Sequence, residues 1–255
     1  MKKIIAIVLV LFSGGAIYAQ DVAVKKHRFG VKIAPGISFL RIGKTGQERD
    51  GVDYSFGYGL QYEYGFSEYF SISTGFLMNS FRGDVTFTEN NPVYFVFNET
   101  VSGNKKTITT DQIYGRQYTF KAVDIPLALK LRTAEIGYLT YFAEFGTTVS
   151  VIYDSYSSKN EVSLSSGDTK SFLSADNEKI DTEDVNLFKL GLNLGLGVEY
   201  NLVGNTSLLV GLNWINGFTN VLKKKSNEIF YKSSGNQLNQ IVKADYIALS
   251  VGVQF

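Results

Sequence analysis

Hydrophobic and polar residues alternate along several stretches of the chain, and the clearest stretch is residues 246–255. One face of this stretch carries large apolar side chains, and the other carries small or polar ones. The apolar face consists of Ile247, Leu249, Val251, Val253 and Phe255. Because side chains of a β-strand point alternately to the two faces of a sheet, this period of two predicts an amphipathic strand.

The same alternation recurs in seven further segments. Strong copies occupy residues 54–66, 123–132 and 187–200, and weaker copies occupy 29–40, 69–80, 139–153 and 206–216. The connections alternate between long (41–53, 81–119, 153–186, 217–243) and short (67–68, 133–138, 201–205). An even number of antiparallel strands joined in this way places all long loops at one end and both termini at the other.

Two all-β architectures fit eight amphipathic strands: a soluble sandwich or lipocalin-like barrel, and a membrane barrel with its apolar face toward lipid. The polar face is dominated by Gly, Ser, Ala and Asn, whereas strands that face water usually carry many charged residues. Small side chains suit the narrow interior of an eight-stranded barrel. The pattern therefore favours an eight-stranded, antiparallel up-and-down transmembrane β-barrel.

Aromatic residues mark both ends of the apolar stripes, as expected where rings meet lipid headgroups. The expected periplasmic belt contains Phe29, Phe66, Phe70, Tyr141, Tyr200 and Phe255. The expected belt at the long-loop end contains Phe39, Tyr54, Tyr153, Phe188 and Trp214.

The N-terminus predicts export. Lys2 and Lys3 precede an apolar run from Ile4 to Phe12, and small residues lead to Ala19. This is typical of a secretory signal peptide cleaved after Ala19. Residues 20–255 would then form the outer-membrane barrel domain. The chain has no Cys and a net charge of +1, so we expect no disulfide and no nucleic-acid partner.

Charged residues on the small-residue face would lie inside the barrel. This candidate lumen charge network comprises Lys32, Glu63, Asp124, Lys130, Arg132, Glu144, Lys189 and Glu199. Four bases balance four acids, and buried charges are costly unless paired, so we expect a closed lumen. In particular, we expect Lys130, Asp124, Glu144 and Glu199 to form one network. A narrow channel for ions or small solutes is the alternative.

Residues suited to catalysis or metal binding are few. His27 is the single His and is expected to precede the first strand, and no Ser or Asp has the spacing of a nucleophile motif. The acidic stretch "DNEKIDTED" (176–184) lacks the spacing of an EF-hand loop. We therefore expect no enzymatic activity, no catalytic residues, no cofactor and no metal site.

The long loops carry the remaining candidates for function. Residues 153–186 are acidic and residues 217–243 are basic, so we expect the two loops to attract each other and form a lid. The connection 81–119 predicts a hairpin with Tyr94, Phe95 and Phe97. This hairpin could be a recognition surface, could extend the barrel wall, or could enter the wall and make ten strands.

The chain resembles the PorT-like family of outer-membrane β-barrel proteins. The resemblance is carried by the signal ending "YAQ" and by "FGVKIAPGISF", "YGLQYEYGFSEYFSISTGF", "VDIPLALKLR" and "YIALSVGVQF". It implies an eight-stranded barrel in the outer-membrane lipid, inserted by the barrel assembly machinery with Phe255 as the insertion signal. One relative belongs to a protein secretion and gliding-motility apparatus. We expect a structural or interaction role with an unknown envelope or extracellular protein partner; a porin-like channel or a secretion component is the alternative.

Overall fold

The computed structural model describes residues 26–44, 46–88, 90–101, 104–157, 159–164, 171–173, 178–180, 182–204 and 206–255. The expected signal peptide and its cleavage site after Ala19 lie outside these residues. No helix in the described ranges is long and apolar enough to span a membrane.

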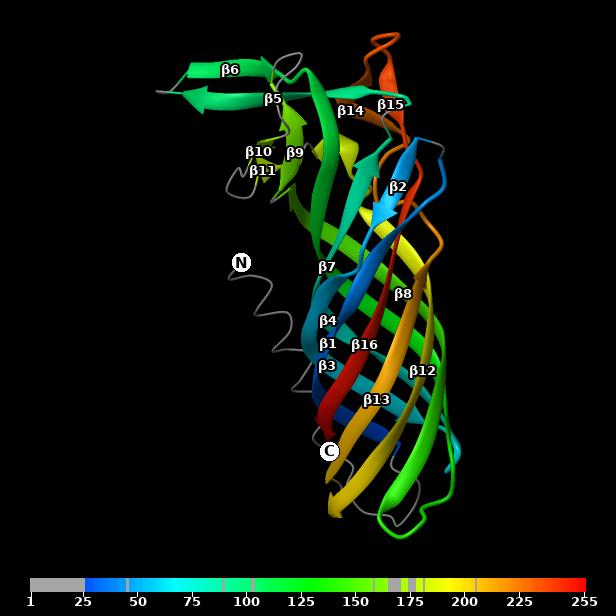
Figure 1. Ribbon diagram of the computed structural model, residues 1–255. Helices are drawn as coiled ribbons and strands as arrows, with labels where there is room; N and C mark the ends of the chain where they lie inside the picture. Colours follow the sequence, from blue (N-terminus) through cyan, green and yellow to red (C-terminus); the bar gives the residue numbers. More distant parts are fainter. Residues whose placement is uncertain are drawn as a thin grey trace.

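Eight long strands form a closed antiparallel barrel (Figure 1). They are β1 (His27–Ile42), β3 (Asp53–Gly65), β4 (Phe70–Phe87), β7 (Gln112–Arg132), β8 (Leu139–Ser157), β12 (Phe188–Val203), β13 (Thr206–Gly217) and β16 (Val242–Gln254). Each pairs with its neighbours along this sequence, and β16 pairs with β1 to close the barrel. The prediction of eight strands is confirmed.

The remaining elements lie at the end of the barrel that carries the long connections (Figure 1). They are β2 (Gln47–Asp50), β5 (Val93–Val101), β6 (Asn104–Thr109), β9 (Asn160–Ser163), β10 (Ser171–Leu173), β11 (Glu178–Lys179), the short 3₁₀ helix η1 (Thr182–Asp184), β14 (Lys225–Tyr231) and β15 (Gln237–Asn239). The β5–β6 hairpin projects sideways from this end and does not enter the barrel wall, so the ten-stranded alternative is wrong.

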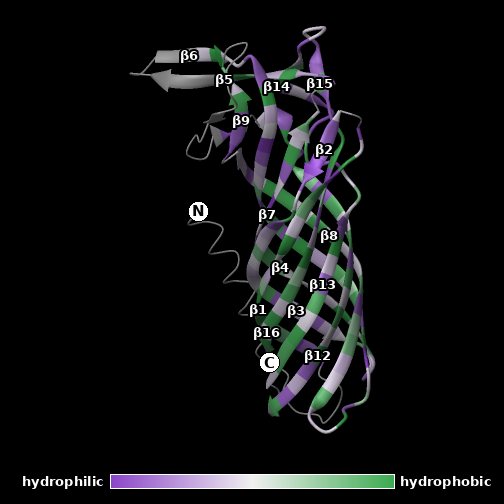
Figure 2. Ribbon diagram, viewed as in Figure 1, coloured by the Kyte–Doolittle hydropathy of each residue, from purple (hydrophilic) through white to green (hydrophobic). Residues whose placement is uncertain are grey.

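Hydrophobic residues alternate with more polar ones along the strands of the lower part of the barrel (Figure 2), and many of the large hydrophobic ones are exposed. Phe76 is 62% exposed and Leu196 is 68% exposed, although both are large hydrophobic residues. Exposure on this scale is unfavourable in water and is expected where the outward side chains contact lipid. The predicted orientation of the apolar face is therefore confirmed.

Toward the long-loop end, the apolar residues move from the outward face of the strands to the inward face. The strand β4 shows this change. Its inward positions change from Ser71 and Ser73 to the buried Phe81 and Val85, while its outward positions become polar, as at Arg82. β4, β7 and β8 continue beyond the predicted strands in this way, so part of the expected loop 81–119 is barrel wall. We call this part of the molecule, with an apolar inside and a polar outside, the outer extension.

Candidate functional site

A cluster of charged side chains crosses the lumen near the end where β1 begins. Glu63 on β3 and Glu199 on β12 stand on opposite walls, because three strands separate them in either direction around the barrel. Lys130 on β7 bridges them, with its Nζ 3.2 Å from Glu63 Oε2 and 2.5 Å from Glu199 Oε1. A single ammonium group therefore links the two walls.

Two arginines complete this cross-lumen cluster, which we define as Arg28, Glu63, Lys130, Arg132 and Glu199. The Arg132 guanidinium pairs with Glu63 and lies 3.3 Å from Glu199 Oε1. Arg28 Nη1 lies 2.9 Å from Glu199 Oε2. The side chains come from β1, β3, β7 and β12, so the cluster ties together strands from all around the barrel.

Polar and aromatic neighbours contact Glu63 and Lys130 of the cluster. Ser71 Oγ donates to Glu63 Oε1, and Gln254 Nε2 donates to Glu63 Oε2. The ring of Phe142 lies 4.1 Å from Lys130 Nζ, which places a cation over an aromatic face. A Cβ at Gly197 would stand 2.5 Å from the Phe142 ring, so a glycine there makes room for the ring.

The cross-lumen cluster is almost dry. The side chains of Glu63 and Lys130 are 0% exposed, and that of Glu199 is 2% exposed. Buried charges are tolerated only when they are paired and hydrogen-bonded, which is the case for both carboxylates and for Lys130. The paired charges therefore lie across the lumen at this level and are shielded from solvent.

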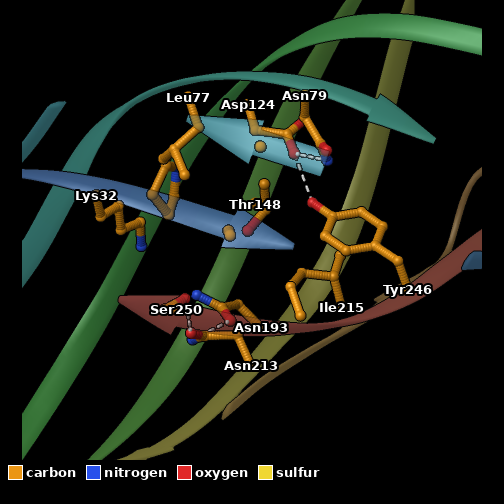
Figure 3. Close-up of a pocket in the computed structure, with 14 residues that line it drawn as sticks. Lys32, Leu77, Asn79, Asp124, Thr148, Asn193, Asn213, Ile215, Tyr246 and Ser250 are labelled. Carbon is orange, nitrogen blue, oxygen red and sulfur yellow. Dashed lines mark hydrogen bonds between the residues drawn. The ribbon is translucent and has the colours of Figure 1, made fainter. Parts of the chain in front are cut away.

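A small polar cavity of about 40 Å³ lies farther along the lumen (Figure 3). Lys32 and Asp124 both line it, and Asp124 accepts hydrogen bonds from Asn79 Nδ2 at 2.8 Å and from the Tyr246 hydroxyl. Asn213 accepts a hydrogen bond from Ser250 on another part of the lining. A cavity of this size holds only a few water molecules.

Two further predicted network residues lie near this level without an ion pair in the described part of the chain. Glu144 accepts a 3.4 Å hydrogen bond from Asn213. Lys189 is 1% exposed, and its Nζ lies 4.9 Å from the Phe81 ring and 4.6 Å from the Tyr246 ring. Cation–π contacts therefore surround an ammonium group that makes no hydrogen bond.

The eight residues predicted as a lumen network thus fall into two groups. Glu63, Lys130, Arg132 and Glu199 meet in the cross-lumen cluster. The other four, Lys32, Asp124, Glu144 and Lys189, lie around and above the small cavity. The expectation that Lys130, Asp124, Glu144 and Glu199 share one network is therefore wrong for Asp124 and Glu144, because the hydrogen bonds of these two carboxylates go to Asn79, Tyr246 and Asn213.

Sequence reasoning missed Arg28 and Tyr246. Arg28 immediately precedes the predicted strand 29–40, and one more step of the alternation would have placed it inside. The alternation of residues 246–255 puts Tyr246 on the face opposite Ile247, but its bond to Asp124 depends on the three-dimensional position of β16 relative to β7. No sequence pattern indicates that contact.

Above the cavity, the outer extension is filled by an apolar core. Its fully buried members include Leu40, Phe81, Phe95, Ile113, Phe120, Val162, Val221, Ile229 and Val242. These residues come from the barrel strands and from the long connections. The lumen therefore contains, in order, the cross-lumen cluster, a small polar cavity and an apolar core.

Two of the three aromatic residues of the candidate interaction loop, Phe95 and Phe97, pack in or against this core. Phe95 is 0% exposed, and its ring stacks on Phe97 at 5.2 Å and lies 4.6 Å beneath the Arg116 guanidinium. Tyr94 stacks on Phe230 of β14 at 5.5 Å. The interpretation of Phe95 as an exposed recognition residue is wrong, because β5 turns this side chain into the apolar core.

The two long loops that were expected to attract each other do meet. Asp184 on η1 accepts hydrogen bonds from Ser226 Oγ at 2.7 Å and from the Asn227 N–H, and Val185 pairs with Leu222. Burial raises the pKa of the Asp184 carboxyl, and the bonds from Ser226 and Asn227 oppose that shift. Backbone and hydroxyl groups hold this contact, and no ion pair joins the loops within the described ranges.

The predicted aromatic belts are mostly on the outward face. Ten of the eleven residues are exposed, and Phe39 is half-buried beneath the Arg49 guanidinium, at 5.2 Å. His27 is the first residue of β1, which begins two residues before the predicted strand 29–40, and its Nδ1 lies 2.8 Å from the Tyr62 hydroxyl. The described residues contain no group of three or more side chains placed to hold a metal ion.

The family description "Outer membrane protein beta-barrel domain" matches residues 18–223, and the chain belongs to this family. Together with the closed eight-stranded fold, this match identifies an outer-membrane β-barrel protein located in the outer membrane and surrounded by its lipid bilayer. No curated protein matches the chain.

Several solved structures are similar in fold at low sequence identity. OprG from Pseudomonas aeruginosa is 12% identical, with 90% of this chain and 94% of that chain covered and a TM-score of 0.43. The N-terminal β-barrel domain of OprF from the same organism is 11% identical, with 89% and 97% covered and a TM-score of 0.37. The outer membrane protease OmpT from Escherichia coli is 9% identical, with 94% and 99% covered and a TM-score of 0.45.

Proposed function

We propose that this protein is a non-enzymatic outer-membrane scaffold with a closed lumen, which acts through its outer extension on an envelope or extracellular protein partner. The observation that carries the proposal is the cross-lumen cluster, in which Lys130 joins Glu63 and Glu199 from opposite walls. The apolar core above it adds a second barrier. A narrow porin-like channel, the alternative, would need both layers to move aside.

The outer extension supports the interaction role. Its core is large enough to hold β5, β9 and β14 in place, so the projecting β5–β6 hairpin has a rigid base (Figure 1). Loops held on a rigid scaffold are the usual carriers of binding function. Membership in the PorT-like group, insertion by the barrel assembly machinery and a place in a secretion apparatus belong to the same proposal and rest on resemblance.

Site-specific photo-crosslinking in intact cells tests the interaction role. A photoreactive residue at Thr109, exposed at the end of β6, should yield a crosslinked protein of one defined mass. The same residue at Glu68, exposed in the short turn between β3 and β4, is the matched control and should not yield that product. Identical products from the two positions, or none from Thr109, would contradict the proposal.

A further inference from the structure

A depression of about 730 Å³ lies on the outward face of the barrel, where β12, β13 and β16 meet the outer extension. Its lining has two parts of different chemistry. The apolar part is Leu187, Phe188, Phe218 and Ile241, and the basic part is Lys223, Lys224 and Lys243.

The apolar part is continuous with the lipid-facing surface of the barrel. Phe188 and Phe218 are 61% and 47% exposed, and Leu190 on β12 and Trp214 on β13 are exposed as well. The lower edge of the depression therefore lies where acyl chains end and headgroups begin, which is where amphipathic side chains are expected.

The basic part has no described counter-charge. Lys223 and Lys224 are exposed, no acidic residue lines the depression, and no described carboxylate lies within 4.0 Å of the three ammonium groups. Asp245, on the same face of β16, is engaged by Arg41 and by the Gly217 N–H. The described partners of its carboxylate are therefore Arg41 and the Gly217 N–H, and none of the three lysines is among them.

The pairing of β1 with β16 is a second observation that points to an anionic ligand beside the lysines. Lys243 on β16 stands directly opposite Arg41 on β1. Like charges in directly opposite positions of a sheet destabilise it, unless another group compensates them. Asp245 compensates Arg41, whereas Lys243 is left to the depression.

The depression is held in a fixed shape by hydrogen bonds. Asn186 Nδ2 donates to the carbonyl oxygens of Asn220 and Leu222, and the Lys223 N–H donates to the Asp184 carbonyl. At its floor, the Phe218 N–H donates to the Leu190 carbonyl. The segment that presents Lys223 and Lys224 is therefore positioned before any ligand arrives.

We propose that this depression binds a phosphorylated headgroup of an outer-leaflet lipid, with the three ammonium groups around a phosphate and Leu187, Phe188 and Phe218 against an acyl chain. Lysine is a common phosphate ligand, and clusters of basic residues beside a membrane-spanning segment recognise anionic headgroups. The commitment to a lipid, and not to free phosphate, rests on the apolar half of the lining.

Native mass spectrometry of the full-length protein in neutral detergent tests this site, with bisphosphorylated lipid A as the probe. Replacement of both exposed lysines (Lys223→Gln with Lys224→Gln) should weaken binding at least about tenfold, since each such charge contributes measurably to anionic-lipid affinity. The matched control, Lys44→Gln with Lys225→Gln, removes the same charge from exposed positions outside the depression and should change binding less than about twofold.

Two further binding experiments distinguish a phosphorylated lipid from free inorganic phosphate as the ligand. Lipid A stripped of its phosphates should bind at least about tenfold more weakly, and inorganic phosphate at the same concentration should not displace the phosphorylated form. Equal loss in the double variant and its control, equal binding of the stripped lipid, or displacement by inorganic phosphate would each overturn the proposal. If the double variant fails to fold, Lys243→Gln on the barrel wall takes its place in the test. This variant should also weaken binding of the phosphorylated lipid.

Discussion

Glu63 and Glu199 stand on opposite walls of the barrel, and both accept a hydrogen bond from the ammonium group of Lys130. Lys130 thus occupies the middle of the lumen, where a conducting pore would need water. With Arg28 and Arg132 it also neutralises two carboxylates that are otherwise shielded from solvent. In the closed scaffold that we propose, the closure of the lumen and the stability of the barrel depend on the same contacts.

Lys130→Met should destabilise the barrel strongly. The change leaves Glu63 and Glu199 buried with less positive charge around them, and breaking a buried ion pair on one side costs about 3–5 kcal/mol. The free energy of unfolding in urea, measured on the protein folded in lipid vesicles, is the readout. Lys32→Met is the matched control, because no described carboxylate pairs with Lys32. An equal loss for the two variants would mean that the cluster has no special role.

Phe81→Ala should destabilise the outer extension by about 3–5 kcal/mol, because it opens a cavity in a fully buried core. Phe76→Ala removes the same side chain from the same strand, but Phe76 is 62% exposed on the lipid face. Lipid can fill the space that it leaves, so the loss should be smaller. Urea unfolding of both variants checks this, and a larger loss for Phe76→Ala would contradict the assignment of inside and outside.

Asp84 should make the β2–β4 contact sensitive to pH. Asp84 is on the outward face of the outer extension, beyond the lipid-facing band, and stands opposite Asp50. Burial, and then the charge of Asp53, raises the pKa of Asp84 from 3.8 to about 6. The folded state therefore binds more protons than the unfolded state between these two values, so stability is highest below the lower one and falls as the pH rises through about 6.

Hydrogen exchange of the amide groups in Gln47–Asp50 measures this effect. Exchange in the wild-type protein should become faster, beyond its intrinsic pH dependence, as the pH passes from 4 to 6. Asp84→Asn should remove that excess, since an amide cannot ionise. If Asp84→Asn shows the same additional increase in exchange rate, a group other than Asp84 causes the pH dependence.

Deletion of Phe255 should lower insertion into the outer membrane. Phe255 and Phe29 exchange two backbone hydrogen bonds of 2.8 Å across the seam between β16 and β1, and the Phe255 side chain is 56% exposed to lipid. The deletion removes both bonds and the aromatic ring, whereas Phe255→Ala removes the ring alone. Fractionation should show the deleted chain exported but not folded in the membrane. Normal insertion of both variants would refute a role for Phe255.

The barrel could be predicted from the sequence because lipid on one side and a narrow lumen on the other impose a period of two on every strand. Lys130 and Glu199 were assigned inward by that period alone. The outer extension was missed because its inward residues are apolar, as at Phe81, and the strands were ended where the assignment of faces reversed.

Other contacts have no signature in sequence. Arg116 on the barrel strand β7 and Glu228 on β14 form a 2.6 Å ion pair, and Asp184 reaches Ser226 across the top of the barrel. These contacts depend on how long connections pack over a common core. The charge difference between residues 153–186 and 217–243 indicated the correct neighbours, but hydrogen bonds and not charge pairs join them in the described ranges.

Single-channel recording in planar lipid bilayers tests the closed lumen most directly. The wild-type protein should show no steady conductance above background, because the cross-lumen cluster and the apolar core both block the lumen. A variant with both carboxylates neutralised, Glu63→Gln with Glu199→Gln, should still show none, because the apolar core remains. A steady open conductance in the wild-type protein would contradict the closed scaffold and favour a channel.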